Sequence, residues 1–129
     1  MNSVLELYDS RVSHIYRDGG EAVINFSHAY IIRYRGKPGE DPCSGWSQEA
    51  ELILEDAIIS DPLPPLPNTI LDGFLQVGGV KHELIPIPFK RKVWGILKLT
   101  FVDGTTIEII GKKPILELFG KPIKLEDFP

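Results

Sequence analysis

The strongest constraint on the fold is an alternating segment around one Asp-Gly pair, GILKLTFVDGTTIEIIG at residues 95–111. Apolar and polar residues alternate on both sides of the pair, which is the period of a half-buried β-strand. A three-residue loop, 102–104, places the apolar residues on one face and the polar residues on the other. Gly104 would then take the left-handed position of a type I turn with a G1 bulge. The predicted pairs are Leu97 with Ile109, Leu99 with Ile107, Lys98 with Glu108 and Thr100 with Thr106.

A second Asp-Gly pair, in VSHIYRDGGEAVINF at residues 12–26, predicts another hairpin. The same comparison of registers favours a three-residue loop over 18–20. This register sets His14 on the apolar face, where a hydrogen-bonded structural histidine is more common than a metal ligand. The predicted pairs are Arg17 with Glu21, Tyr16 with Ala22, His14 with Ile24 and Val12 with Phe26.

Residues 47–59 fit either a helix or a strand. Helical spacing is met by the apolar residues at 50, 53, 54, 57 and 58, with Ser47 in place as a cap. The same segment also alternates, with Ala50, Leu52 and Leu54 on one side and mostly glutamates on the other. The hairpins elsewhere in the chain favour the strand.

Prolines mark two places where an internal strand cannot form. The connector 61–69, DPLPPLPNT, has four prolines in six residues, which remove backbone donors. It is predicted to be a polyproline-like link between two halves, because each half alone is too small to be stable. Pro86 and Pro88, in KHELIPIPF, lie two residues apart on one side of a strand, which predicts an edge strand.

With further turns at Gly36-Lys37-Pro38-Gly39 and at Gly78-Gly79, the chain is predicted to be all-β. We expect a single domain over residues 1–129, an antiparallel sandwich or barrel of about nine or ten strands. The composition, 43% apolar and 25% charged, is typical of a soluble globular protein. One cysteine cannot form an internal disulfide, and no signal peptide or membrane-spanning apolar run is present. The predicted location is therefore cytoplasmic, with no membrane contact.

Cys43, the one cysteine of the chain, lies in the stretch GEDPCSGW. A cysteine nucleophile needs a helix N-terminus or a nearby cation to stabilise its thiolate, and usually a histidine as base. Glu40 and Asp41 precede Cys43 instead, and negative charge raises a thiol pKa. We expect a packing role for Cys43 and no catalytic residue, unless 47–59 is a helix that begins just after it.

No metal, cofactor or nucleic-acid site is predicted. The sequence has no Cys-x-x-Cys or His-x-His pair, and His28 and His82 could meet only through the fold. No glycine-rich motif matches a dinucleotide or phosphate loop. The net charge is −4, and the basic run 90–92 is more typical of a solvated turn than of a phosphate site.

Four residues are candidates for binding. Trp46 follows a glycine-containing loop and Trp94 follows the basic run, and large amphipathic side chains on loops commonly anchor interfaces. A tryptophan at the start of a strand is also commonly a lid on the core. Pro86 and Pro88 either block edge-to-edge aggregation or present a groove to a partner.

Several short motifs add a family resemblance. They are WSQEAEL, an LP pair, a DG pair, IPIP, the Asp-Gly hairpin and LEDFP, all between about residue 39 and residue 129. Over this range the chain resembles a family of small uncharacterised bacterial all-β proteins. The resemblance implies a bacterial cytoplasmic origin, and it implies no activity, cofactor or catalytic residue.

The clearest signals in the sequence concern strand pairing, and none concerns chemistry. We therefore expect a non-enzymatic β-scaffold that contacts a protein partner or a second copy of itself. The alternative is a barrel that binds a small apolar ligand, which requires an interior larger than its own side chains fill. A small hydrolase that uses Cys43 is the least favoured function.

Overall fold

The computed structural model of the protein describes residues 1–37 and 40–129, and these residues form nine strands and no helix. The strands are β1 (Asn2–Asp18), β2 (Glu21–Tyr34), β3 (Cys43–Ile59), β4 (Asn68–Val77), β5 (Val80–His82), β6 (Leu84–Ile87), β7 (Phe89–Lys90), β8 (Trp94–Phe101) and β9 (Thr106–Phe128). The all-β prediction is confirmed, and β3 confirms the strand prediction for 47–59. The predicted loop Gly36-Lys37-Pro38-Gly39 lies partly outside the described residues.

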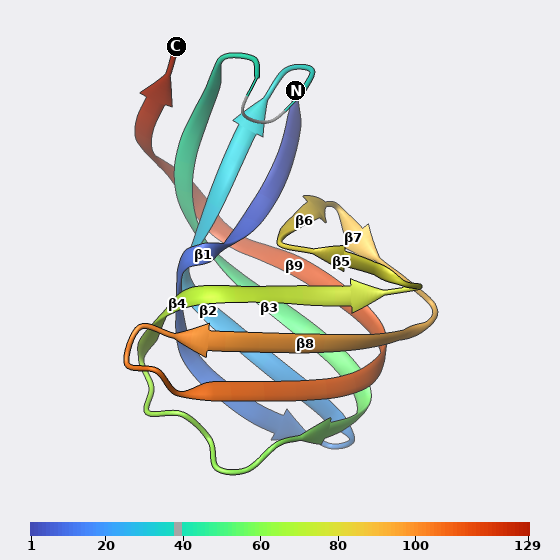
Figure 1. The fold of residues 1–129 in the computed structure, drawn as a ribbon. Coiled ribbons are helices and arrows are strands. Elements are labelled where there is room, and N and C mark those ends of the chain that lie inside the picture. The colour runs from blue at the N-terminus through green and yellow to red at the C-terminus, as the bar shows by residue number, and fades with distance from the viewer. Residues whose placement is uncertain (38–39) are drawn as a thin grey trace.

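All the strands belong to one antiparallel sheet that curls into a partly closed ring (Figure 1). Neighbouring strands follow the order β5-β4-β8-β9-β3-β2-β1-β6, and β7 adds to β9. A short pairing of β1 with β4, at Arg11–Thr69 and Val12–Asn68, closes the ring. In Figure 1, β4, β8 and the first half of β9 cross the front, while β1, β2 and β3 cross behind them. The fold thus combines the closure of a barrel with the two facing layers of a sandwich.

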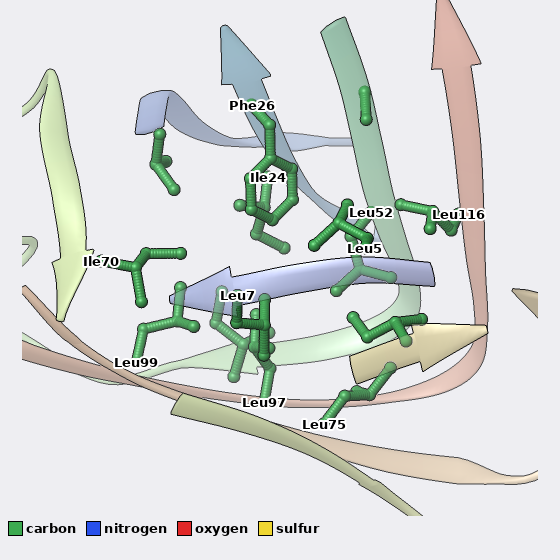
Figure 2. Close-up of a cluster of buried hydrophobic side chains, with 14 of the residues drawn as sticks. Leu5, Leu7, Ile24, Phe26, Leu52, Ile70, Leu75, Leu97, Leu99 and Leu116 are labelled. Carbon is green, nitrogen blue, oxygen red and sulfur yellow. The ribbon is translucent and has the colours of Figure 1, made fainter. Parts of the chain in front are cut away.

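Large apolar side chains fill the inside of the ring. Phe26, Phe89 and Phe101 are each less than 2% exposed. Figure 2 shows Ile24 and Phe26 pointing toward the leucines of the opposite layer. Burying a side chain of this size contributes about 1.5–3 kcal/mol to the free energy of unfolding. Packing within this cluster therefore holds the two layers together.

The hairpin predicted around Asp103 and Gly104 is confirmed at all four pairs. Phe101 N–H donates to the Thr105 carbonyl at 2.8 Å, which closes the three-residue loop. Gly104 has a φ of 86°, the left-handed region that glycine adopts without steric cost. The hydroxyl and the N–H of Thr105 both donate to the Asp103 carboxylate, and these bonds lower the pKa of Asp103.

The register predicted for the β1–β2 hairpin is wrong near its turn. The loop contains two residues, Gly19 and Gly20, instead of three. Gly19 has a φ of 62°, and a positive φ at the first loop position is typical of a type II′ turn. The observed pairs are Asp18 with Glu21, Arg17 with Ala22, Tyr16 with Val23 and His14 with Asn25.

This shorter turn moves His14 to the other side of the sheet. His14 is exposed on the outer face, so the expectation that it lies on the apolar face is wrong. The predicted pair of Val12 with Phe26 does form, because β1 has an irregularity between Val12 and His14 that restores the register. A single inserted residue therefore decides which side chains of β1 face the core.

Three non-glycine residues with positive φ mark similar points on the long strands. Asp9, Asp56 and Lys113 have φ values of 70°, 47° and 52°. In β3, the inward alternation of 50, 52 and 54 ends at Asp56, where the pairing with β9 shifts. Beyond it Ala57 is buried and Ile58 is 67% exposed, so the bulge reverses the two faces of the strand.

Replacing Lys113 by glycine is expected to raise the free energy of unfolding by up to about 1 kcal/mol. The left-handed conformation costs an L-residue roughly 1–2 kcal/mol, part of which the entropy of glycine offsets. The ion pair of Lys113 with Glu55 is exposed and adds little. Urea unfolding of Lys113→Gly and Lys113→Ala tests this, since both lack the ion pair. A glycine variant no more stable than the alanine variant would contradict the expectation.

The proline-rich connector ends two residues earlier than predicted, because Asn68 and Thr69 of the predicted segment 61–69 belong to β4. Residues 61–67 contain no strand, yet Pro64 is buried and Leu66 packs against the core. Asn68 Nδ2 donates to the Pro65 carbonyl at 3.2 Å, which ties the connector to the start of β4. The β6 strand pairs with β1 and ends the sheet order, so the edge-strand prediction is confirmed.

Candidate interaction surface

The four predicted binding residues lie at three separate places in the fold. Trp46 lies on the inner side of β3, where its indole packs against the core. Its Nε1 donates to Ser44 Oγ at 2.8 Å. The guanidinium carbon of Arg33 lies 4.1 Å from the ring centroid. Trp46 therefore covers the core at this point, and its indole contacts both Ser44 and Arg33.

Pro86 and Pro88 lie at the β6 edge of the sheet. Pro86 is half-buried opposite Val4 of β1, and Pro88 is exposed where β6 passes into β7. A proline has no backbone N–H, so both rings remove donors from this edge. Such an edge is a poor template for pairing with another chain.

Trp94 is the predicted residue that lies in an exposed apolar surface. It opens β8 and is 51% exposed. The pairing of β8, β9 and β3 sets Ile96, Ile110 and Ile58 in one line across the outer side of the sheet, beside Trp94. Ile58 is 67% exposed, and the other two isoleucines are half-buried. We call these four residues the isoleucine surface.

Charged residues border the isoleucine surface on both sides along the strands. Lys112 lies opposite Trp94, with its Nζ 3.3 Å from Asp56 Oδ2 and 5.3 Å from the Trp94 ring centroid. On the other side, Lys98 and Glu108 form an ion pair at 3.2 Å. Exposed ion pairs contribute about 0–1 kcal/mol each, so their role in stability is small. Their effect is to place a line of apolar side chains between two charged lines.

Part of this surface was predictable. The predicted pairing of Leu97 with Ile109 already implies that Ile96 faces Ile110 on the outer side. The outward orientation of Ile58 was not predictable. If the alternation of the buried residues Leu52 and Leu54 continued along β3, Ile58 would face the core. Only the bulge at Asp56 turns it outward.

Cys43 lies on the wall of an outer hollow of about 630 Å³, which Arg33 and Arg35 also line. Cys43 is a half-buried free cysteine at the start of β3, opposite Tyr34 and Phe128. The segment after it is a strand, so no helix N-terminus stabilises a thiolate. Within residues 1–37 and 40–129, no group of three or more histidine, cysteine, aspartate or glutamate side chains is placed to hold a metal ion.

The contacts given by the three histidines are with residues other than Cys43. His82 packs edge-on against the Phe89 ring, with the centroids 5.5 Å apart. Burial, and then the nearby Arg91 charge, lower the pKa of His82. Nδ1 of His28 and Nδ1 of His14 each lie within hydrogen-bond distance of the hydroxyl of a neighbouring serine.

A tyrosine links three strands on the outer side near the termini. Gly45 of β3 leaves room for the Tyr30 ring, since a Cβ there would lie 2.8 Å from Tyr30 Cζ. The Tyr30 hydroxyl donates to the Glu126 carboxylate. Burial, followed by this bond, raises the pKa of Tyr30 well above its usual value. The phenol therefore stays protonated and joins β2 to β9 across β3.

Two hollows formed by the described residues are open to solvent. One, of about 700 Å³, lies between residues 60–64 and the β8–β9 hairpin. Another, of about 430 Å³, has polar walls that include His14, Asn25 and Glu51. Neither is lined by the phenylalanines that fill the ring.

None of the described residues forms a helix that could cross a membrane. Comparison of the chain with protein-family models, with curated proteins and with solved structures finds no match. The resemblance of residues 39–129 to a bacterial family stays a prediction.

Proposed function

We propose that the protein is a non-enzymatic β-scaffold that binds another protein through the isoleucine surface. One observation carries the proposal, namely the line of Ile96, Ile110 and Ile58 beside Trp94 on the outer side of the sheet. The solvent face of an antiparallel sheet is ordinarily polar. A contiguous apolar area with a charged rim is typical of a protein interaction site.

The backbone under this surface is already ordered. The β8 strand is paired with β4 on one side and β9 on the other, and β9 is paired with both β8 and β3. A partner that binds here does not have to order a loop, so little conformational entropy is lost on binding. Rigid placement of one aromatic anchor and three aliphatic side chains fits the usual composition of a binding hot spot.

The two other functions considered draw no support from the structure. A ligand-binding barrel requires interior space, and Phe26, Phe89 and Phe101 occupy the interior. A hydrolase requires an activated thiol with a base, but Cys43 begins a strand and no histidine lines the hollow beside it.

A photo-crosslinking experiment tests the proposal. The probe p-benzoylphenylalanine takes the place of Trp94 in the cells that make the protein. We expect a covalent adduct with a protein, identified by mass spectrometry, in far higher yield than with the same probe in place of Tyr8. Tyr8 is the matched control because it is 52% exposed and belongs to β1. Adducts absent at both positions, or equal at both, would count against the proposal.

A further inference from the structure

We infer that the protein bound at the isoleucine surface is a second copy of the same chain, related by a two-fold axis. The inference rests on the proposed function, because it names the partner of that surface. It follows from the way the side chains of the surface are ordered along β8 and β9.

We place the two-fold axis along the line of Ile96, Ile110 and Ile58, which crosses the middle of the isoleucine surface. On β8 the outward residues run Trp94, Ile96 and Lys98, and on β9 the residues opposite them are 112, 110 and 108. A two-fold axis along the central line brings each isoleucine onto the isoleucines of the second copy. The same rotation brings the line of Trp94 onto the line of Lys98. Two sheets can pack face to face in this way at about 10 Å.

The charges of the two copies match in this arrangement. Lys112 of each copy faces Glu108 of the other, which gives two equivalent ion pairs. Trp94 of each copy faces Lys98 of the other, where an ammonium group can lie over the indole. On β3, Asp56 faces the uncharged Ser60 of the other copy. No two directly opposed positions carry like charges, so the charge pattern of this face is complementary to that of its own copy.

A second exposed apolar segment is less suited to self-association. Ile123 and Leu125, near the end of β9, are 65% and 54% exposed. That edge contains Pro122, and its pairing with β3 is irregular beside Leu125. Proline, bulges and flanking charge are the features by which edge strands avoid pairing. The isoleucine surface contains no proline, and its charged borders carry both signs.

Exchange of two charges gives the sharpest test. By sedimentation equilibrium over a roughly hundredfold concentration range, we expect the unaltered protein to be a reversible dimer. Lys112→Glu and Glu108→Lys should each weaken the dimer roughly tenfold or more, because like charges then face each other twice. An equimolar mixture of the two variants should dimerise again. One copy then offers only carboxylates at positions 108 and 112, and the other only ammonium groups.

Two further variants keep the result interpretable. Ile58→Asp, at a site already 67% exposed, should also weaken the dimer without loss of fold. Lys124→Glu removes an exposed ion pair with Asp127 outside this surface and should leave the dimer unchanged. Thermal melts followed by circular dichroism confirm that each variant is folded.

The outcomes separate this inference from the proposed function. Recovery of the dimer in the mixture supports the two-fold contact. A monomeric protein whose Trp94 probe captures a different protein overturns the inference and leaves the proposed function standing. A dimer that none of the three surface variants weakens overturns the inference, and a protein that neither dimerises nor forms an adduct overturns both.

Discussion

Replacing Phe26 by alanine is expected to lower the free energy of unfolding by about 3–5 kcal/mol, the usual range for a fully buried phenylalanine. Phe26 of β2 is 0% exposed and pairs with Ala50 of β3, a residue too small to fill the space. Figure 2 shows it in the middle of the core, with Ile24 beside it. The sheet pairs on both sides of β2, so the backbone cannot collapse into the cavity.

Urea unfolding at constant m-value measures this loss. Phe119→Ala is the control, because Phe119 is 38% exposed on the outer side of β9 and is expected to cost about 1 kcal/mol or less. Equal losses for the two variants would show that Phe26 is not a central core residue. A loss below about 2 kcal/mol for Phe26→Ala would lead to the same conclusion.

Gly111→Ala is expected to destabilise the protein by about 1–3 kcal/mol through overpacking. A Cβ at Gly111 would lie 2.7 Å from Leu54 Cβ and 2.9 Å from the Glu55 carbonyl oxygen. The second of these is a backbone atom in a paired strand, so it cannot move away without stretching the β3–β9 ladder. The strands can approach this closely only because Gly111 has no side chain.

The matched control for Gly111 is Gly20→Ala. A Cβ at Gly20 would meet one atom, Asp56 Oδ1, at an ordinary 3.6 Å, and Gly20 has no positive φ. This variant is expected to be neutral or slightly stabilising, since alanine restricts the unfolded chain. Similar thermal midpoints for the two variants would refute the close contact at Gly111.

Local pairing was predictable from the sequence where one turn fixes the register. In the hairpin of β8 and β9, a shift of one residue would have placed Lys98 among apolar side chains, so only one loop length fits. The hairpin of β1 and β2 has no such penalty, because Tyr16 and His14 tolerate either face. The pattern therefore favoured a three-residue loop where the structure has a two-residue loop.

The bulges were not predictable, and they decide where the candidate site lies. Asp56 and Lys113 adopt positive φ values without the glycine that would have announced them. The pairing of β3 with β9, which are far apart in the sequence, imposes these conformations. A sequence pattern over a few residues contains no information about such long-range pairing. Trp94 could therefore be predicted from the sequence, while Ile58, two strands away on the same surface, could not.

The pairing of β3 between β2 and β9 also has a consequence for the order of synthesis. β3 (Cys43–Ile59) receives its first neighbour as soon as it is made, but its second neighbour is β9 (Thr106–Phe128). At roughly 5–20 residues per second, several seconds of translation separate the two strands. During that time one edge of this long strand, which includes Leu52 and Leu54, is open to other nascent chains. Glu49, Glu51 and Glu55, which alternate along it, give that edge the negative charge that keeps such chains apart.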